Sequence, residues 1–217
     1  MFRKPLLLSL PAIFALALVP ARASTIEYNL TVDQCTGRCG PAGTVFGTIT
    51  LTDTVANTVR VKVRLASDFE FSHTASPVTV AWDLAGNPTI FANDLPSGWS
   101  LLSSIAGSLP MTKKDDFEYG LSWSARNGWF AQSDSSLNFT LTGAGLSTSS
   151  FEGTSSNHFF AVDIYNAATC APEAGKTGVV ETTPEFGIAD TPEPGSVALF
   201  GCGLVTFAWM LWKRAKR

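Results

Sequence analysis

VRVKVRL, residues Val59–Leu65, alternates strictly between apolar and basic side chains. In the segment before it, Val45, Gly47, Ile49 and Leu51 alternate in a similar way with Thr48, Thr50 and Thr52. Because successive side chains of a strand point to opposite faces, this pattern predicts two β-strands, each with one buried and one solvated face. We interpret the row of Arg60, Lys62 and Arg64 as the solvated face of an edge strand, which needs no ligand to explain it.

The same period of two recurs over most of the chain. Each run is rich in β-branched and aromatic residues and is bounded by turn-forming residues. The further runs are residues 26–33, 78–84, 117–123, 137–141 and 160–164. Strands with one apolar face need a second layer to cover that face. The sequence therefore predicts an all-β fold, an antiparallel β-sandwich of jelly-roll or immunoglobulin-like topology over residues 24–170.

Residues 171–191 differ from the segment before them, because proline, threonine and glutamate dominate over large apolar residues. We expect a linker here, with Val179 and Val180 as a possible last edge strand. The chain as a whole is 45% hydrophobic and 15% charged, which excludes a disordered protein. A formal net charge of −3 argues against a nucleic-acid partner.

The charges are segregated along the chain. Residues 1–23 and the last five residues hold seven basic residues and no acid, whereas residues 24–194 carry a net charge of −10. Two membrane-directed ends flanking an exported acidic domain produce this pattern.

The first 23 residues have the order of a secretory signal peptide. Arg3 and Lys4 precede an apolar run from Leu6 to Val19, and small residues then stand at Ala21 and Ala23, before Ser24. The apolar run is too short for a stable spanning helix, so we expect residues 1–23 to be removed by signal peptidase.

The last 26 residues, 192–217, have three parts. Pro192-Glu193-Pro194 precedes an apolar segment at residues 197–212, and a basic tail of Lys213, Arg214, Lys216 and Arg217 ends the chain. Sixteen helical residues span about 24 Å, less than the hydrocarbon core of a bilayer, which marks a marginal transmembrane helix. The basic tail places the C-terminus on the cytoplasmic side, and residues 24 to about 194 outside.

These three parts resemble the PEP-CTERM sorting signal of Gram-negative bacteria. The resemblance implies recognition by an exosortase, a membrane transpeptidase-like enzyme that cuts near Pro192-Glu193-Pro194. Residues 45–170 are also similar to a group of uncharacterised PEP-CTERM proteins, in segments such as residues 95–100, 117–120, 137–146 and 158–164. The implied function is that of an exported cell-surface or extracellular-matrix protein with a structural or adhesive role in an exopolysaccharide or biofilm matrix. A single-pass, membrane-anchored periplasmic domain is the alternative.

Export permits disulfides. Cys35 and Cys39 flank a glycine-containing loop and form the first choice of pair, while Cys170 stays free or pairs instead with one of them. The spacing does not match a C-x-x-C redox centre, and two cysteines with a distant histidine are too few ligands for zinc. We therefore predict a structural disulfide and no cofactor.

No catalytic motif is present. His73 and His158 lie far apart in the sequence, and the chain has no G-x-S-x-G, H-E-x-x-H or P-loop motif. Asp115, Asp116 and Glu118 follow two lysines, and we interpret this cluster as a solvated loop. We expect a protein that is not an enzyme.

Two further binding hypotheses remain open. Calcium could use the carboxylates after Lys114, or Asp68 and Glu70. A carbohydrate-binding module could use Trp99 and Trp129, because each follows glycine in a loop-like context and could stack on a sugar ring.

Overall fold

The two segments with the clearest alternation form the central hairpin of the fold. In the computed structural model, β2 (Gly47–Val55) and β3 (Thr58–Leu65) pair antiparallel, joined by a turn in which Asn57 has a φ of 63°. The structure describes residues 24–72, 78–103, 109–111, 115–124, 135–168, 175–183 and 187–188.

The described residues form an all-β fold in which every strand pair is antiparallel. Besides β2 and β3, the strands are β1 (Thr25–Asp33), β4 (Phe69–Phe71), β5 (Val80–Leu84), β6 (Ile90–Asn93), β7 (Trp99–Ser103), β8 (Leu109–Pro110), β9 (Asp116–Phe117), β10 (Tyr119–Trp123), β11 (Ser136–Gly143), β12 (Phe151–Glu152), β13 (Phe160–Asn166), β14 (Thr177–Thr182) and β15 (Gly187–Ile188). A short 3-10 helix, Thr148–Ser150, precedes β12.

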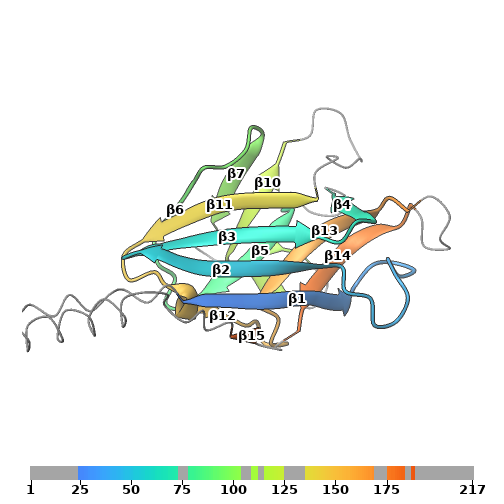
Figure 1. Cartoon of the computed structure of the whole chain (residues 1–217), viewed down its shortest axis with the longest axis horizontal. Helices are drawn as coiled ribbons and strands as arrows, with labels where there is room; N and C mark the ends of the chain where they lie inside the picture. Colours follow the sequence, from blue (N-terminus) through green and yellow to red (C-terminus); the bar gives the residue numbers. More distant parts are fainter. Residues whose placement is uncertain are drawn as a thin grey trace, which may run out of the picture. The chain divides into compact units, whose positions relative to one another are not determined.

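One large sheet runs in the order β6-β11-β3-β2-β1-β14-β13-β5-β10-β7. The sheet folds back on itself, so that β11, β3, β2 and β1 form one layer and β5, β10 and β7 lie in the layer behind it (Figure 1). The two ends of the path, β6 and β7, are in contact, which leaves the sheet nearly closed. This is the layered, sandwich-like arrangement that the alternation predicts.

Aromatic side chains fill the space between the two layers. Trp82 of β5 packs against Phe139 of β11 with ring centroids 5.8 Å apart, and Tyr28 of β1 packs against Phe160 of β13 at 5.4 Å. All four of these side chains are almost fully buried and belong to one continuous core. Burial of this apolar surface is the main stabilising contribution to the fold.

A second, smaller core covers the opposite face of the rear layer. It includes Ala161 and Val179 from the large sheet and Val78, which precedes β5, together with Met111 and Phe117 from the short β8–β9 segment. As a result, β5 and β13 are buried on both faces. The sequence predicts only one covered face, because the covering segment has no strong periodic pattern of its own.

Two edge assignments from the sequence are wrong. β14 lies between β1 and β13, and Val179 and Val180 are both buried, one in each core. β3 lies between β2 and β11, so its basic row does not belong to an edge strand.

The terminal signals lie outside the described residues. These are the signal peptide at residues 1–23 with its cleavage site at Ala21, Ala23 and Ser24, of which Ser24 alone is described, and the sorting signal at residues 192–217. Within the described ranges, no helix has the length and apolar character needed to cross a membrane.

Two matched valine substitutions test the position of the core. Val61 of β3 is fully buried, whereas Val55 at the end of β2 is 66% exposed. We expect Val61→Ala to lower the free energy of unfolding by about 2 kcal/mol, because it removes buried methyl groups and leaves a cavity. Val55→Ala should change it by less than about 0.5 kcal/mol. Urea denaturation measures both, and equal losses would contradict the assigned register.

Candidate functional site

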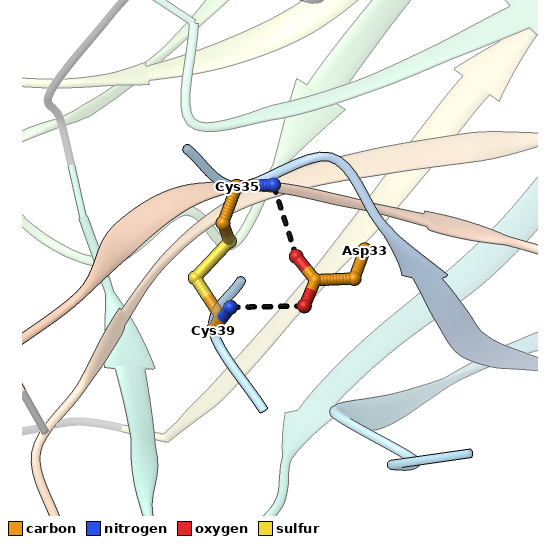
Figure 2. A group of neighbouring side chains, drawn as sticks. All are labelled: Asp33, Cys35 and Cys39. Atoms are coloured by element: carbon orange, nitrogen blue, oxygen red, sulfur yellow. Dashed lines mark hydrogen bonds between the residues drawn. A yellow bond between two sulfur atoms is a disulfide. The ribbon is translucent and has the colours of Figure 1, made fainter. Parts of the chain in front are cut away.

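A carboxylate caps the disulfide loop that follows β1. Cys35 and Cys39 form a disulfide with their Cα atoms 5.6 Å apart. Asp33 accepts a hydrogen bond from the backbone N–H of Cys35 at Oδ1 and another from Cys39 at Oδ2, each 2.9 Å long (Figure 2). Gly37 and Arg38 turn the loop with positive φ angles of 85° and 65°. Backbone donors and a covalent bond therefore fix the same five-residue loop.

The chemistry of this loop is structural. Asp33, Cys35 and Cys39 place three potential metal ligands together, but the disulfide occupies both sulfurs, and a metal ion requires the thiolate. Cys39 is fully buried. Cys170, the alternative partner considered from the sequence, lies outside the described residues.

A second polar cluster forms on the outer face of the rear layer, beside the smaller core. Its members are Asp115, which precedes β9, His158, which precedes β13, and Glu181 in β14. Val180 belongs to the main core and Val179 to the smaller one, so alternation places Glu181 on the same face as Val179. Three distant parts of the chain thus meet at one point.

A tight turn positions His158. The backbone N–H of Thr154 donates to the carbonyl oxygen of His158 at 2.9 Å, and Asn157 has a positive φ of 65°. Just after the turn, the N–H groups of Phe159 and Phe160 donate to the hydroxyl of Thr182, at 3.0 and 3.1 Å. These bonds hold the imidazole beside β14.

One ring nitrogen of His158 faces two carboxyl groups. Nδ1 lies 2.9 Å from Oδ2 of Asp115 and 3.0 Å from Oε2 of Glu181. The amide Nε2 of Gln34 donates to the same Glu181 oxygen at 3.1 Å. Both carboxyl side chains are inaccessible to solvent, whereas the imidazole is 14% exposed. His158 is therefore the member of the cluster that meets solvent.

The two carboxyl groups have opposite pKa shifts. Burial acts to raise the pKa of Asp115, but hydrogen bonds involving His158 and the hydroxyls of Ser156 and Thr154, with the charge of His158, outweigh it and lower that pKa. Burial raises the pKa of Glu181, and the charge and hydrogen bond of Asp115 add to the rise against the lowering effect of His158. The pKa of Asp115 therefore lies below its ordinary value and that of Glu181 above it, because the two buried carboxyl groups influence each other.

The arrangement does not form a nucleophile and base pair in the described part of the chain. Asp115 orients the imidazole through Nδ1, as an acid does in a catalytic triad. However, among the residues with described positions, no hydroxyl or thiol is hydrogen bonded to Nε2 of His158. Two acids and one imidazole nitrogen that converge form a set of ligands for a cation instead.

Asp116 and Glu118, which are grouped with Asp115 in the sequence, do not belong to this cluster. Asp116 is exposed and Glu118 half-buried, whereas Asp115 is only 1% exposed and so does not belong to a solvated loop. The sequence gives no direct sign of the cluster. An indirect sign is Glu181 itself, since an acid that continues a buried valine pair in an internal strand requires a partner.

The tryptophans predicted as sugar contacts do not form a shared surface among the described residues. Trp99 is 8% exposed and lies in β7, where its ring packs against Trp123 and Phe71 with centroids 6.4 and 5.5 Å apart. Its faces are thus turned into the core rather than toward a ligand. Trp129 lies outside the described residues.

Comparison with known proteins identifies no relative of this chain. No family model, no curated protein and no solved structure matches it. Function is therefore argued from the geometry above and from the sequence.

Asp83 of β5 has a pKa raised to about 6. Burial is the main cause, and the negative charges of Glu118, Glu152 and Asp115 add to it, against the lowering effect of the Glu118 backbone N–H, which donates to Asp83 Oδ1 at 2.7 Å. The folded state thus binds this proton more tightly than the unfolded chain, whose ordinary pKa is 3.8. Ionisation of Asp83 destabilises the fold as the pH rises from about 4 to about 6.

We expect Asp83→Asn to remove this penalty, because the amide oxygen still accepts the Glu118 N–H. After discounting for solvent screening, the free energy of unfolding should rise by about 1 kcal/mol near pH 7.5 and stay unchanged near pH 3.5. Denaturation curves across this pH range provide the measurement, with exposed Asp116→Asn as the control. A loss of stability near pH 7.5 would show that the carboxylate is stabilising.

Proposed function

We propose that this chain is an exported protein of the PEP-CTERM type with a non-enzymatic, structural or adhesive role in an extracellular polysaccharide matrix. In this proposal, signal peptidase cuts before Ser24 and an exosortase cuts near Pro192-Glu193-Pro194. The apolar segment 197–212 anchors the chain in the inner membrane only between these two steps. The domain that reaches the surface is the all-β fold described above.

The disulfide supports export. Cys35 and Cys39 are joined in the loop just after β1, and such bonds persist in oxidising compartments such as the periplasm and the cell exterior. The segregation of charge supports it as well, because the acidic domain lies between two basic ends.

The main observation that supports a role in a polysaccharide matrix is a row of basic side chains on the outer face of the front layer. Arg60, Lys62 and Arg64 are all exposed and alternate with the buried valines of β3. They make up three of the eight basic residues in the acidic segment 24–194. Among the residues whose positions are described, none of the three forms an ion pair.

Hydroxyl and amide side chains flank this row on both sides. Lys62 lies between Thr50 of β2 and Asn138 of β11, while the arginines are flanked by Thr48, Thr52, Ser136 and Thr140. The nearest acid in register on this face, Glu27 of β1, pairs with Thr50 and so lies two strands from Lys62, about 10 Å away. A sheet face with three exposed cations and neighbouring hydrogen-bonding groups suits an acidic polysaccharide.

Affinity electrophoresis tests this contact. We expect the protein to be retarded in gels that contain alginate but not in gels that contain neutral dextran, and the retardation should weaken as salt is added. Lys62→Gln should reduce the retardation, and the triple change of Arg60, Lys62 and Arg64 to glutamine should remove it. Lys176→Gln, which removes an exposed cation elsewhere, is the matched control. Equal effects of Lys62→Gln and Lys176→Gln on the retardation would show that it depends on net charge alone and not on this row of side chains.

Intact-mass measurement on cell fractions of the native host tests export and processing. We expect a species that begins at Ser24 and ends near Pro194 in the surface or matrix fraction, 2 Da heavier after reduction for the disulfide between Cys35 and Cys39. A species in the inner membrane that retains Arg217 would instead establish a single-pass anchored periplasmic domain and refute exosortase processing.

A further inference from the structure

The cluster of Asp115, His158 and Glu181 contains more acceptors than donors. The imidazole of His158 offers at most one N–H at Nδ1, yet two carboxyl oxygens lie 2.9 and 3.0 Å from that atom. Only one of them can receive a linear hydrogen bond. The second carboxyl oxygen therefore lies beside Nδ1 without an N–H of its own.

The strongest observation in favour of a bound cation is the environment of Oε1 of Glu181. Glu181 is fully buried, and its Oε1 accepts no hydrogen bond within the part of the chain that the structure describes. A buried carboxyl oxygen without a donor costs about 1–3 kcal/mol. Buried charges in proteins are usually paired or coordinate a metal.

The spacing of the three groups fits one ion. Their ligand atoms all lie within 4.8 Å of one another. Two ligands on opposite sides of an ion, each about 2.1–2.4 Å from it, are about 4.2–4.8 Å apart, and ligands at right angles are about 3 Å apart. The distances of 2.9 and 3.0 Å from His158 Nδ1 to the two carboxyl oxygens match the second case.

We propose that Asp115, His158 and Glu181 form a binding site for a divalent transition-metal ion, with Zn²⁺ as its best-fitting probe. The imidazole nitrogen favours zinc and its neighbours over Ca²⁺ and Mg²⁺, both of which prefer oxygen alone, and zinc also accepts the two carboxylate oxygens. Three protein ligands leave further positions for water.

The surroundings of the site support a bound ion. Gln34 donates to Glu181 Oε2, and Ser156 and Thr154 bond to Asp115, so both carboxylates are oriented by outer partners as metal ligands usually are. The partial exposure of His158 gives an ion a route from solvent. The oxidised Cys35–Cys39 pair does not compete for the metal, because neither sulfur is a thiolate.

Metal titration of the full chain in mild detergent, under oxidising conditions and without a histidine tag, tests the proposal. We expect one Zn²⁺ per chain in competition with a chromogenic chelator. Glu181→Gln and His158→Ala should each weaken binding by about 100-fold, since each removes a ligand. Asp116→Asn, the exposed neighbour of Asp115, should bind as the original chain does.

X-ray absorption of the zinc-loaded original chain decides the question even if both variants fail to fold. We expect one imidazole nitrogen and otherwise oxygen ligands. The chain has only two histidines, so His73→Ala, which should keep that signal, assigns it to His158. Sulfur ligands, loss of the signal in His73→Ala, or no stoichiometric uptake of Zn²⁺ would each overturn the proposal.

Discussion

The whole architecture depends on covering the apolar face of a single antiparallel sheet. The sheet is long enough to fold over itself, and this brings Trp82 and Phe139, which lie on different layers, into contact. Once the inner face is closed, the chain can place polar and charged groups only on the outside or in paired clusters. The cationic row of β3 lies on the outside, whereas the groups around His158 form a paired cluster.

Alternation predicts the strands well wherever one face is solvated. β2, β3 and β11 lie where the pattern places them, because polar and apolar residues report directly on the two faces. Alternation does not predict a strand whose two faces are both buried. Val179 and Val180 carry no alternation, since each contributes to a different core, and so β14 looks like part of a linker.

The same limit explains why the candidate metal site could not be found from the sequence. Asp115, His158 and Glu181 are spread over 67 positions of the chain, and neither their spacing nor their neighbours indicate contact. They meet because β13 pairs with β14 and because the β8–β9 segment covers that face. By contrast, the pairing of Cys35 with Cys39 needs only a short glycine-containing turn, which sequence spacing predicts.

The disulfide loop and the His158 cluster are mechanically connected. Gln34 lies between Asp33 and Cys35, its backbone N–H donates to Val179 of β14 at 3.0 Å, and its side chain holds Glu181. Packing is close at this point, since a Cβ added to Gly178 would lie 2.7 Å from the Cα of Cys35. The disulfide restrains the loop that carries Gln34, the outer partner of a proposed ligand. The Cys35–Cys39 bond thus also supports the geometry of the proposed ion site.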